Sequence, residues 1–184
     1  MRPLRRVRAF SRDGVARAEF VGRARKALGL NVEEASSVAQ AVDGAAIVTL
    51  VTRATKPILG ASMPAAGTHV NAVGAISPER TEFEPALLSS CAAVVADSVP
   101  QVQSLSSEFI QYYGRDESKW RAVRPLSAVV AEGRGRPAGA DLTLFKAMGM
   151  GISDLALGIE ILRRATEQRL GREFPHPQPV KLFA

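Results

Sequence analysis

Polar and small residues follow the predicted strands of this chain at the points where an open α/β sheet binds its ligands. Such sheets hold ligands beyond the carboxyl ends of their strands. The residues at these predicted ends are Ser11, Arg12, Asp13, Thr52, Arg53, Val73, Gly74, Ala75, Asp97 and Ser98. The sequence therefore predicts a ligand-binding site along one edge of a sheet.

Other kinds of chemistry find less support in the chain. His69 and His176 lie far apart and lack the local spacing of zinc ligands, so no metal site is predicted. His69 begins an apolar run and is expected to be a hydrogen-bonded structural residue. Glu79, Glu82 and Glu84 lie close together, but a solvated loop explains them without a catalytic carboxylate pair. No Gly-x-Ser-x-Gly nucleophile elbow is present.

Glycine pairs give only a weak signal for a dinucleotide site. The fingerprint of such a site is Gly-x-Gly-x-x-Gly between a strand and a helix. Gly133-Arg134-Gly135 and Gly149-Met150-Gly151 both lack the third glycine and a strong preceding strand. A turn before the last helix explains Gly149 and Gly151 equally well.

Composition indicates one globular domain. The chain has 184 residues, of which 46% are hydrophobic and 23% charged, enough to bury one sizeable core. We expect this domain in residues 1–170, followed by an irregular, proline-containing tail in residues 171–184. The single cysteine, Cys91, lies in an apolar run and is expected to be a buried structural thiol. No run approaches the ~18 apolar residues of a membrane span, so a soluble cytoplasmic protein without membrane contact is expected.

The net charge of +6 permits a nucleic-acid or phosphate partner. However, the arginines are spread along the chain, and the dense group in Arg2–Arg8 has no aromatic residues around it that could stack on bases. A solvated basic edge is therefore favoured over nucleic-acid binding.

Hydrophobic periodicity predicts alternating strands and helices. Strands or extended segments are expected at 7–11, 31–36, 45–52, 69–74, 92–97 and 142–145, and helices at 16–28, 38–42, 83–90, 99–113, 125–131 and 152–170. Asp13 and Ser153 are expected to cap helices, and Gly29 to end one. The apolar, β-branched runs are typical of strands buried on both faces of a parallel sheet, so an α/β fold is predicted.

The run Gly67-Thr68-His69-Val70-Asn71-Ala72-Val73-Gly74 resembles the signature of the ornithine cyclodeaminase/mu-crystallin family. Further stretches agree in order and spacing. They are Ala46-Ile47-Val48 with Thr52, Lys56-Pro57-Ile58-Leu59, Arg80-Thr81-Glu82-Phe83, Val95-Ala96-Asp97, and Leu142-Thr143-Leu144-Phe145-Lys146 with Gly149 and Asp154. The resemblance covers nearly the whole chain up to Leu170.

This resemblance implies a Rossmann-like NAD(P)-binding domain, joined in the family to a second domain that carries substrate-binding residues and the dimer interface. The family's activities include ornithine cyclodeamination, alanine dehydrogenation and the reduction of ketimines and other cyclic imines. All of them pass hydride between a nicotinamide and a carbon that bears nitrogen, and the protein supplies orientation and electrostatics. The resemblance thus implies an amino acid or cyclic imine as substrate, and a homodimer if the protein is complete.

The resemblance also implies roles for the predicted site residues. Ser11, Arg12 and Asp13 would meet the adenosine ribose, and Arg12 favours the 2′-phosphate of NADP over NAD. Asp13 suits either a ribose hydroxyl or a helix cap. The remaining cofactor contacts would come from Thr52, Arg53, Val73, Gly74, Ala75 and Lys146.

Three departures from the family pattern change the expectation. The first strand, its glycine-rich loop and the preceding substrate domain have no counterpart, so we expect an incomplete sheet and impaired activity. Ile76 stands where cyclodeaminases carry a catalytic aspartate, which favours imine or ketimine reduction as the parent reaction. Ala147 replaces a common serine near the cofactor. A non-catalytic binding protein in the manner of mu-crystallin, or an inactive remnant, is the alternative.

Overall fold

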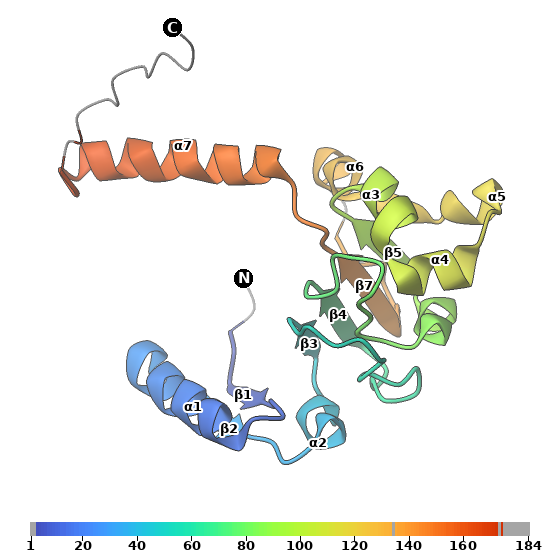
Figure 1. The fold of residues 1–184 in the computed structure, drawn as a ribbon, viewed down its shortest axis with the longest axis horizontal. Coiled ribbons are helices and arrows are strands. Elements are labelled where there is room, and N and C mark those ends of the chain that lie inside the picture. Colours follow the sequence, from blue (N-terminus) through green and yellow to red (C-terminus); the bar gives the residue numbers. More distant parts are fainter. Residues whose placement is uncertain (1–2, 134, 173, 175–184) are drawn as a thin grey trace, which may run out of the picture. The chain divides into compact units, whose positions relative to one another are not determined.

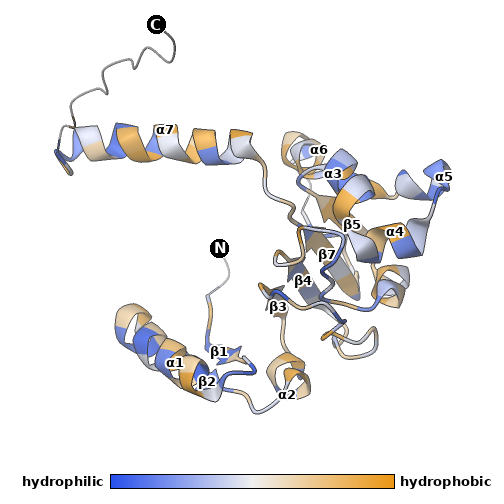
Figure 2. Ribbon diagram, viewed as in Figure 1, coloured by the Kyte–Doolittle hydropathy of each residue, from blue (hydrophilic) through white to orange (hydrophobic). Residues whose placement is uncertain are grey.

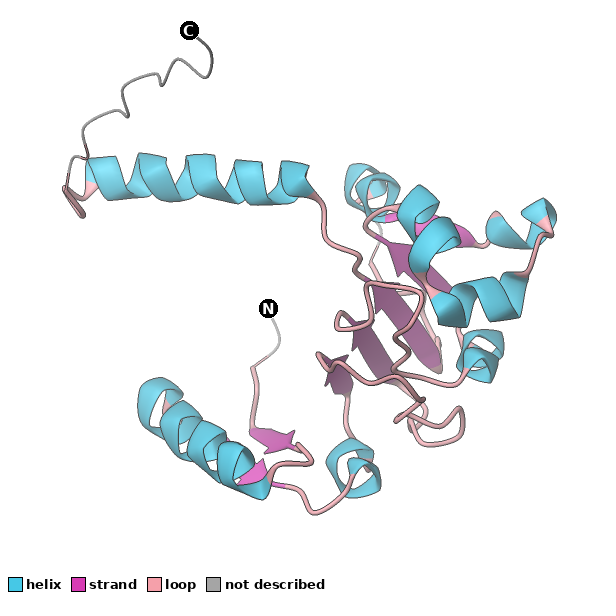
Figure 3. Cartoon of the chain, viewed as in Figure 1, coloured by secondary structure: helices cyan, strands magenta, loops and turns pink. Residues whose placement is uncertain are grey.

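A computed structural model gives the fold and describes residues 3–133, 135–172 and 174. The chain divides into two compact units, with the boundary between Gly149 and Met150. Strands and helices alternate along most of the first unit, although β4 follows β3 without a helix between them (Figure 1, Figure 3). The predicted α/β class with parallel sheets and flanking helices is confirmed.

The first unit begins with a strand, a helix and a second, parallel strand. These are β1 (Arg6–Ala9), α1 (Gly14–Leu28) and β2 (Asn31–Glu34). The Asp13 carboxylate accepts hydrogen bonds from the backbone N–H groups of Val15 (2.9 Å) and Ala16 (3.1 Å), which have no partner within the helix. Gly29 ends the helix at φ 63°, a left-handed conformation that glycine adopts without steric cost. Both predicted ends of this helix are confirmed.

A five-stranded parallel sheet follows, with the strand order β3-β4-β7-β5-β6. Its members are β3 (Ile47–Leu50), β4 (Thr68–Ala72), β5 (Ala93–Ala96), β6 (Val123–Pro125) and β7 (Leu142–Lys146). The last strand in sequence, β7, lies at the centre, hydrogen-bonded to β4 on one side and β5 on the other. The carboxyl ends of β3, β4, β7 and β5 therefore lie next to one another at one edge.

The hydrophobic core of the unit forms on one face of this sheet. Strand residues in it are Val48, Leu50, Val70, Ala72, Val94, Ala96, Leu142 and Leu144, and helix residues include Leu87, Leu88, Val102, Phe109, Tyr113 and Trp120. On β3 the alternate residues Ile47 and Thr49 are exposed. The expectation of burial on both faces is therefore wrong for this strand, because β-branched residues also suit a half-exposed pleated surface.

Short helices connect the strands. They are α2 (Val38–Val42), the 3-10 helix η1 (Pro85–Ser90), α3 (Val99–Leu105), α4 (Ser107–Tyr113), α5 (Glu117–Trp120) and α6 (Leu126–Glu132). The helix predicted over 99–113 is two helices divided at Ser106, whose buried hydroxyl donates to the Glu108 carboxylate at 2.8 Å. β6 and α5 are too short to have been predicted from periodicity.

The second unit consists mainly of α7 (Gly151–Glu167), on which polar and apolar residues alternate (Figure 2). Met150 stands at its N-cap position and Ser153 lies within the helix, so the prediction that Ser153 caps it is wrong. Most of the predicted tail, residues 173 and 175–184, lies outside the described residues. Within the described part of the chain, no helix has the length and apolar character that a membrane span requires.

The outer edges of β1 and β3 have no partner strand among the described residues. Unpaired strand edges expose backbone donors and acceptors to which other chains can pair. We therefore expect the purified chain to self-associate, which sedimentation velocity will detect as species that grow with concentration. A single monomeric species with sharp cooperative thermal unfolding would contradict this prediction.

A charge placed on the β3 edge strand tests the source of that association. Ile47 on this strand is 40% exposed. The substitution Ile47→Lys should shift the sedimentation distribution toward monomer, because a lysine on an edge strand discourages pairing with another chain. Val15→Lys on α1 adds the same charge at a residue that is 72% exposed but lies in no strand. It should leave the distribution unchanged.

Candidate functional site

The carboxyl edge of the larger sheet collects several of the predicted site residues. Thr52 follows β3, Gly74 and Ala75 follow β4, and Lys146 ends β7. β4 pairs with both β3 and β7, all in parallel, so these residues emerge at the same edge. The backbone at this edge is ordered by Glu82, which was not among the predicted site residues.

Glu82 ties the ends of β3 and β4 together. Its side chain is fully buried, and its Oε1 accepts hydrogen bonds from the backbone N–H (2.6 Å) and hydroxyl (2.8 Å) of Thr52. Its Oε2 accepts from the backbone N–H groups of Gly74 (2.8 Å) and Ala75 (3.1 Å). A buried carboxylate is stable only when such donors replace water, and here both oxygens are satisfied.

The prediction of a solvated loop is therefore wrong for Glu82, although Glu79 and Glu84 are exposed. Hydrophobic periodicity could not predict the burial of Glu82, because its partners Thr52 and Gly74 lie 30 and 8 positions away in sequence, just after two strands. The one available signal was its place in the Arg80-Thr81-Glu82-Phe83 stretch of the resemblance.

Gly74 packs directly against the backbone of Thr52 at the end of β3. A β-carbon at this position would overlap the backbone of Thr52 and lie 2.5 Å from Oε1 of Glu82. Gly74 is not among the residues of positive φ, so the need for glycine here is steric rather than conformational. The absence of a side chain is what allows Thr52 and the 74–75 backbone to share one carboxylate.

A second buried carboxylate supports the first. Glu108 is fully buried, accepts from the backbone N–H of Glu82 at 2.9 Å, and accepts from the Ser106 hydroxyl at 2.8 Å. The break between α3 and α4 at Ser106 places this side chain. Glu108 thereby fixes the backbone from which Glu82 projects.

Lys146 is also fully buried, and its ammonium donates a hydrogen bond to the Ala75 carbonyl oxygen. Burial lowers the pKa of this ammonium, while the negative charges of Glu108, Glu82 and Asp97 act to raise it. The position of Lys146 was predicted to contact the cofactor. In the structure its terminal nitrogen holds the backbone of the 74–75 turn from within the protein.

Asp97, at the carboxyl end of β5, orders the turn after β7. Its carboxylate accepts from the backbone N–H groups of Met148 (2.9 Å), Gly149 (2.9 Å) and Ser98 (2.7 Å). Three backbone N–H groups thus occupy the Asp97 carboxylate. These hydrogen bonds account for an aspartate at this strand end, so no ligand contact is needed to explain it.

Several side chains at this edge are exposed. Val51 is 68% exposed and Arg53 is also exposed after β3, while Val73 is 37% and Ile76 47% exposed after β4. The edge therefore presents an apolar surface at the end of β4 and a cation at the end of β3. An apolar surface of this kind can take one face of an aromatic ring.

Ser11, Arg12 and Asp13 lie at the end of β1 and are exposed. No hydrogen bond or ion pair within the described residues joins them to the site at the end of β3 and β4. The Asp13 carboxylate serves as the cap of α1, and Arg17 donates to the Ser11 carbonyl at 2.8 Å. Within the part of the chain that the structure describes, the Arg12 guanidinium has no hydrogen-bond or ion-pair partner.

His69 is a hydrogen-bonded structural residue, as predicted. Its Nδ1 lies 2.8 Å from the Thr143 hydroxyl and its Nε2 lies 3.1 Å from Oδ1 of Asn71. Over residues 3–133, 135–172 and 174, no group of three or more His, Cys, Asp or Glu side chains is arranged to hold a metal ion.

Comparison with protein families gives one match that spans most of the chain. The family model described as the ornithine cyclodeaminase/mu-crystallin family matches residues 1–169. An uncharacterized cyclodeaminase of Sinorhizobium fredii is 30% identical over 175 residues, which are 95% of this chain and 53% of that protein. The ketimine reductase mu-crystallin of Macropus fuliginosus is 35% identical over 126 residues, covering 67% of this chain and 37% of the relative.

Solved structures agree on the fold. The Δ(1)-pyrroline-2-carboxylate reductase of Thermococcus litoralis, solved with NADH and L-proline, superposes with a TM-score of 0.82 at 22% identity. The match covers 92% of this chain and 53% of that one. The chain thus spans about half the length of the S. fredii and T. litoralis proteins.

Proposed function

Because the chain belongs to the ornithine cyclodeaminase/mu-crystallin family, we propose that it forms the cofactor-binding part of an NAD(P)-dependent oxidoreductase. The observation that carries this proposal is the ordered carboxyl edge of the sheet, where Glu82 and Lys146 fix the backbone of Thr52, Gly74 and Ala75. Ligands of open parallel sheets bind at such an edge. When bound there, a nicotinamide dinucleotide supplies or accepts the hydride.

The residues of this chain would orient the cofactor rather than exchange protons with the substrate. Val73 and Ile76 offer exposed apolar side chains beside the 74–75 turn. Because Glu82 and Lys146 are fully buried and hydrogen-bonded, they position the turn from behind. We expect the direct cofactor contacts to come from Thr52, Arg53 and the 73–75 backbone.

Ile76 bears on the reaction class. An isoleucine side chain cannot take up or release a proton, and it stands where cyclodeaminases of the family carry an aspartate. Imine or ketimine reduction, or the corresponding amino-acid oxidation, is therefore the parent reaction that we propose. The substrate that we propose is an amino acid or a cyclic imine. A homodimer, expected if the protein is complete, stays a prediction.

We propose NADP as the preferred cofactor, on the basis of Arg12. Its guanidinium is exposed and unpaired among the described residues, and the neighbouring Asp13 carboxylate is occupied by the α1 N-terminus. A free guanidinium beside a strand end suits a 2′-phosphate, whereas a carboxylate free to bind the ribose hydroxyls would suit NAD.

Replacing Arg12 tests this cofactor preference. Arg12→Ala should weaken NADPH binding by about 10- to 100-fold and leave NADH binding nearly unchanged, since one charge-assisted contact is worth about 1.5–3 kcal/mol. Calorimetric titration of the full chain measures both dissociation constants. Arg23→Ala, an exposed arginine within α1, controls for the loss of net charge. Equal losses for both cofactors, or an equal loss in the Arg23 variant, would refute the assignment.

A second candidate is a non-catalytic binding protein, which Ile76 favours because it removes a proton-exchanging group. Titration with NADPH and NADH, followed by an assay of cyclic-imine reduction, separates the candidates. Binding with turnover supports the reductase, and binding without turnover supports the binding protein. If neither cofactor binds, both proposals fail and the chain is an inactive remnant.

A further inference from the structure

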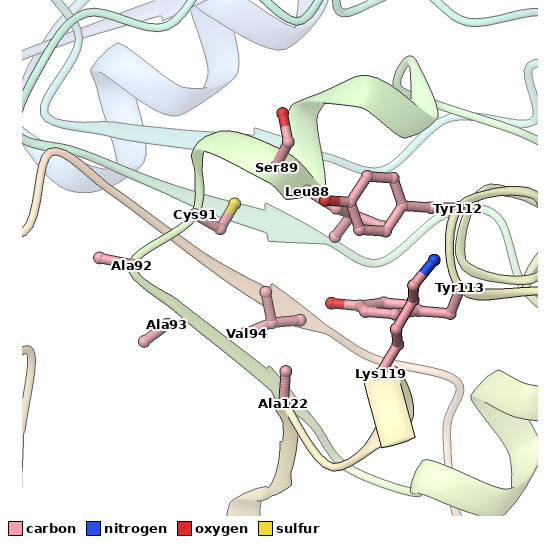
Figure 4. A pocket seen from close by; sticks show the side chains of 10 residues that line it. All are labelled: Leu88, Ser89, Cys91, Ala92, Ala93, Val94, Tyr112, Tyr113, Lys119 and Ala122. Atoms are coloured by element: carbon pink, nitrogen blue, oxygen red, sulfur yellow. The ribbon is translucent and has the colours of Figure 1, made fainter. Parts of the chain in front are cut away.

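A cavity opens at the amino-terminal end of β5, away from the carboxyl edge that holds the candidate cofactor site. It has a volume of about 520 Å³, within the range of small-molecule pockets. Its wall is formed by η1, the start of β5, α4, α5 and the loop residues beside them, and it includes Leu88, Cys91, Val94, Tyr112, Tyr113 and Lys119 (Figure 4). None of these residues belongs to the candidate cofactor edge, and β5 continues for two residues beyond Val94, roughly 7 Å at about 3.3 Å per residue.

Tyr113 directs a hydroxyl group into this cavity (Figure 4). The residue is only 5% exposed, and no side chain or backbone group among the described residues hydrogen-bonds to its hydroxyl. The hydroxyl is nevertheless not sealed off, because no described side-chain polar atom is both fully buried and without a partner. It therefore reaches the cavity, and an acceptor in the cavity is the partner that it can find.

The aromatic ring of Tyr113 is held firmly. Its centroid lies 4.9 Å from the rings of both Trp120 and Tyr112 and 5.9 Å from that of Phe109. Burial, with smaller contributions from Tyr112 and Cys91, raises the pKa of Tyr113 to about 12. The hydroxyl thus stays protonated near neutral pH and can donate a hydrogen bond.

The other polar groups of the cavity favour an anion. The Lys119 ammonium shares the cavity, and its only ion pair among the described residues is a long one, 3.9 Å from Asp116. Asp116 is itself held by the Ser118 backbone N–H at 3.0 Å. Burial raises the pKa of Cys91 to about 12, so this thiol stays uncharged. None of the lining residues is acidic.

Most of the remaining wall is apolar, with Leu88, Val94 and Ala122 facing the space. Two further hydroxyls line it: Ser89, which donates to the Ala86 carbonyl at 2.7 Å, and Tyr112 (Figure 4). Leu88 and Val94 belong to the hydrophobic core. A ligand must therefore combine an apolar body with a single anionic acceptor group. A strongly hydrated inorganic anion would leave the apolar wall without a contact. A cation would be repelled by the Lys119 ammonium.

We propose that this cavity binds a small monocarboxylate. Its apolar body lies against Leu88 and Val94, and its carboxylate accepts hydrogen bonds from the Tyr113 hydroxyl and the Lys119 ammonium. The site is separate from the proposed cofactor edge, so it can be tested without any cofactor.

Trp120 provides the readout, because it is the single tryptophan of the chain and its ring adjoins that of Tyr113. We expect benzoate to change the Trp120 fluorescence of the full chain in a saturable manner. Benzamide, a neutral analogue of the same shape, should bind at least about 10-fold more weakly, the loss of one charge-assisted hydrogen bond. No saturable change with benzoate, or equal binding of the two probes, would overturn the proposal.

Two variants assign the binding groups. Tyr113→Phe keeps the ring and removes the hydroxyl, and Lys119→Met keeps an unbranched side chain, one atom shorter, and removes the charge; each should weaken benzoate binding by about 10-fold. The Lys119 variant should also lose the preference for benzoate over benzamide. Arg121→Met, an exposed residue that does not line the cavity, should bind like the wild type.

A folding defect in Tyr113→Phe would appear in its thermal unfolding and in the Trp120 emission without ligand. The Lys119 side chain is exposed, so Lys119→Met should leave the fold unchanged. If Tyr113→Phe misfolds, the benzoate affinity of Lys119→Met therefore decides the proposal. If Lys119→Met binds benzoate as the wild type does, the carboxylate site is refuted.

Discussion

Gly74→Ala is expected to lower the free energy of unfolding by about 3 kcal/mol, the upper part of the range for overpacked sites. The new β-carbon would overlap the Thr52 backbone and press on the Glu82 carboxylate. Neither neighbour can move away cheaply, because Thr52 is hydrogen-bonded to Glu82 through both its backbone and its hydroxyl. Urea unfolding followed by far-UV circular dichroism measures the loss.

The control for this prediction is the same substitution where space is free. A β-carbon on Gly22, within α1, meets no atom within 4 Å, so Gly22→Ala should keep or raise stability by up to about 1 kcal/mol. If Gly74→Ala unfolds at the same urea concentration as the wild type, the close approach of the β3 and β4 ends is wrong. A stable Gly74→Ala protein that still binds dinucleotide would also remove this turn from the proposed cofactor site.

Glu82→Gln is expected to destabilise the chain by about 2–5 kcal/mol. A glutamine amide has only one oxygen, so its NH₂ group must face either the Thr52 donors or the backbone N–H groups of Gly74 and Ala75. Each buried donor left without an acceptor costs about 1–3 kcal/mol. The loss of a negative charge also leaves the buried Lys146 ammonium with less compensation.

Glu79→Gln is the matched control, since Glu79 is exposed three residues earlier. It should change the free energy of unfolding by no more than about 0.5 kcal/mol. Where Glu82→Gln still folds, its affinity for NADPH should fall as well, because the Thr52 and 74–75 backbone would no longer be held together. A Glu82→Gln protein as stable as Glu79→Gln would show that the four hydrogen bonds do not form.

These two predictions concern residues that the sequence presented very differently. The Gly74 region was predicted to lie at a ligand edge, because it follows a predicted strand of an open α/β sheet. Glu82 was predicted to be solvated, because three glutamates within six positions are typical of an exposed loop. Its burial depends on donors at the ends of two strands, and local sequence carries no trace of that geometry.

The residues of the candidate site likewise fall into those predictable from local sequence and those whose position depends on the fold. Residues at strand ends could be named from the sequence, because a strand end is a local feature of hydrophobicity and turn residues. The buried position of Lys146 could not, since it depends on β7 inserting between β4 and β5. The cavity beside Tyr113 was also hidden, because it is formed by four elements that only the sheet order and the α3–α4 break bring together.

The α/β class, most strands and helices, the capping of α1 by Asp13 and Gly29, and the resemblance to the family could all be predicted from the sequence. All of these are local, since hydrophobic period, cap chemistry and ordered motifs are properties of neighbouring residues. The central place of β7 and the buried set of Glu82, Glu108 and Lys146 became known only from the fold, whereas unpaired strand edges were already expected from the missing first strand. Charged side chains can be buried only where distant backbone groups and opposite charges replace water, so their positions follow from the fold rather than from the chain.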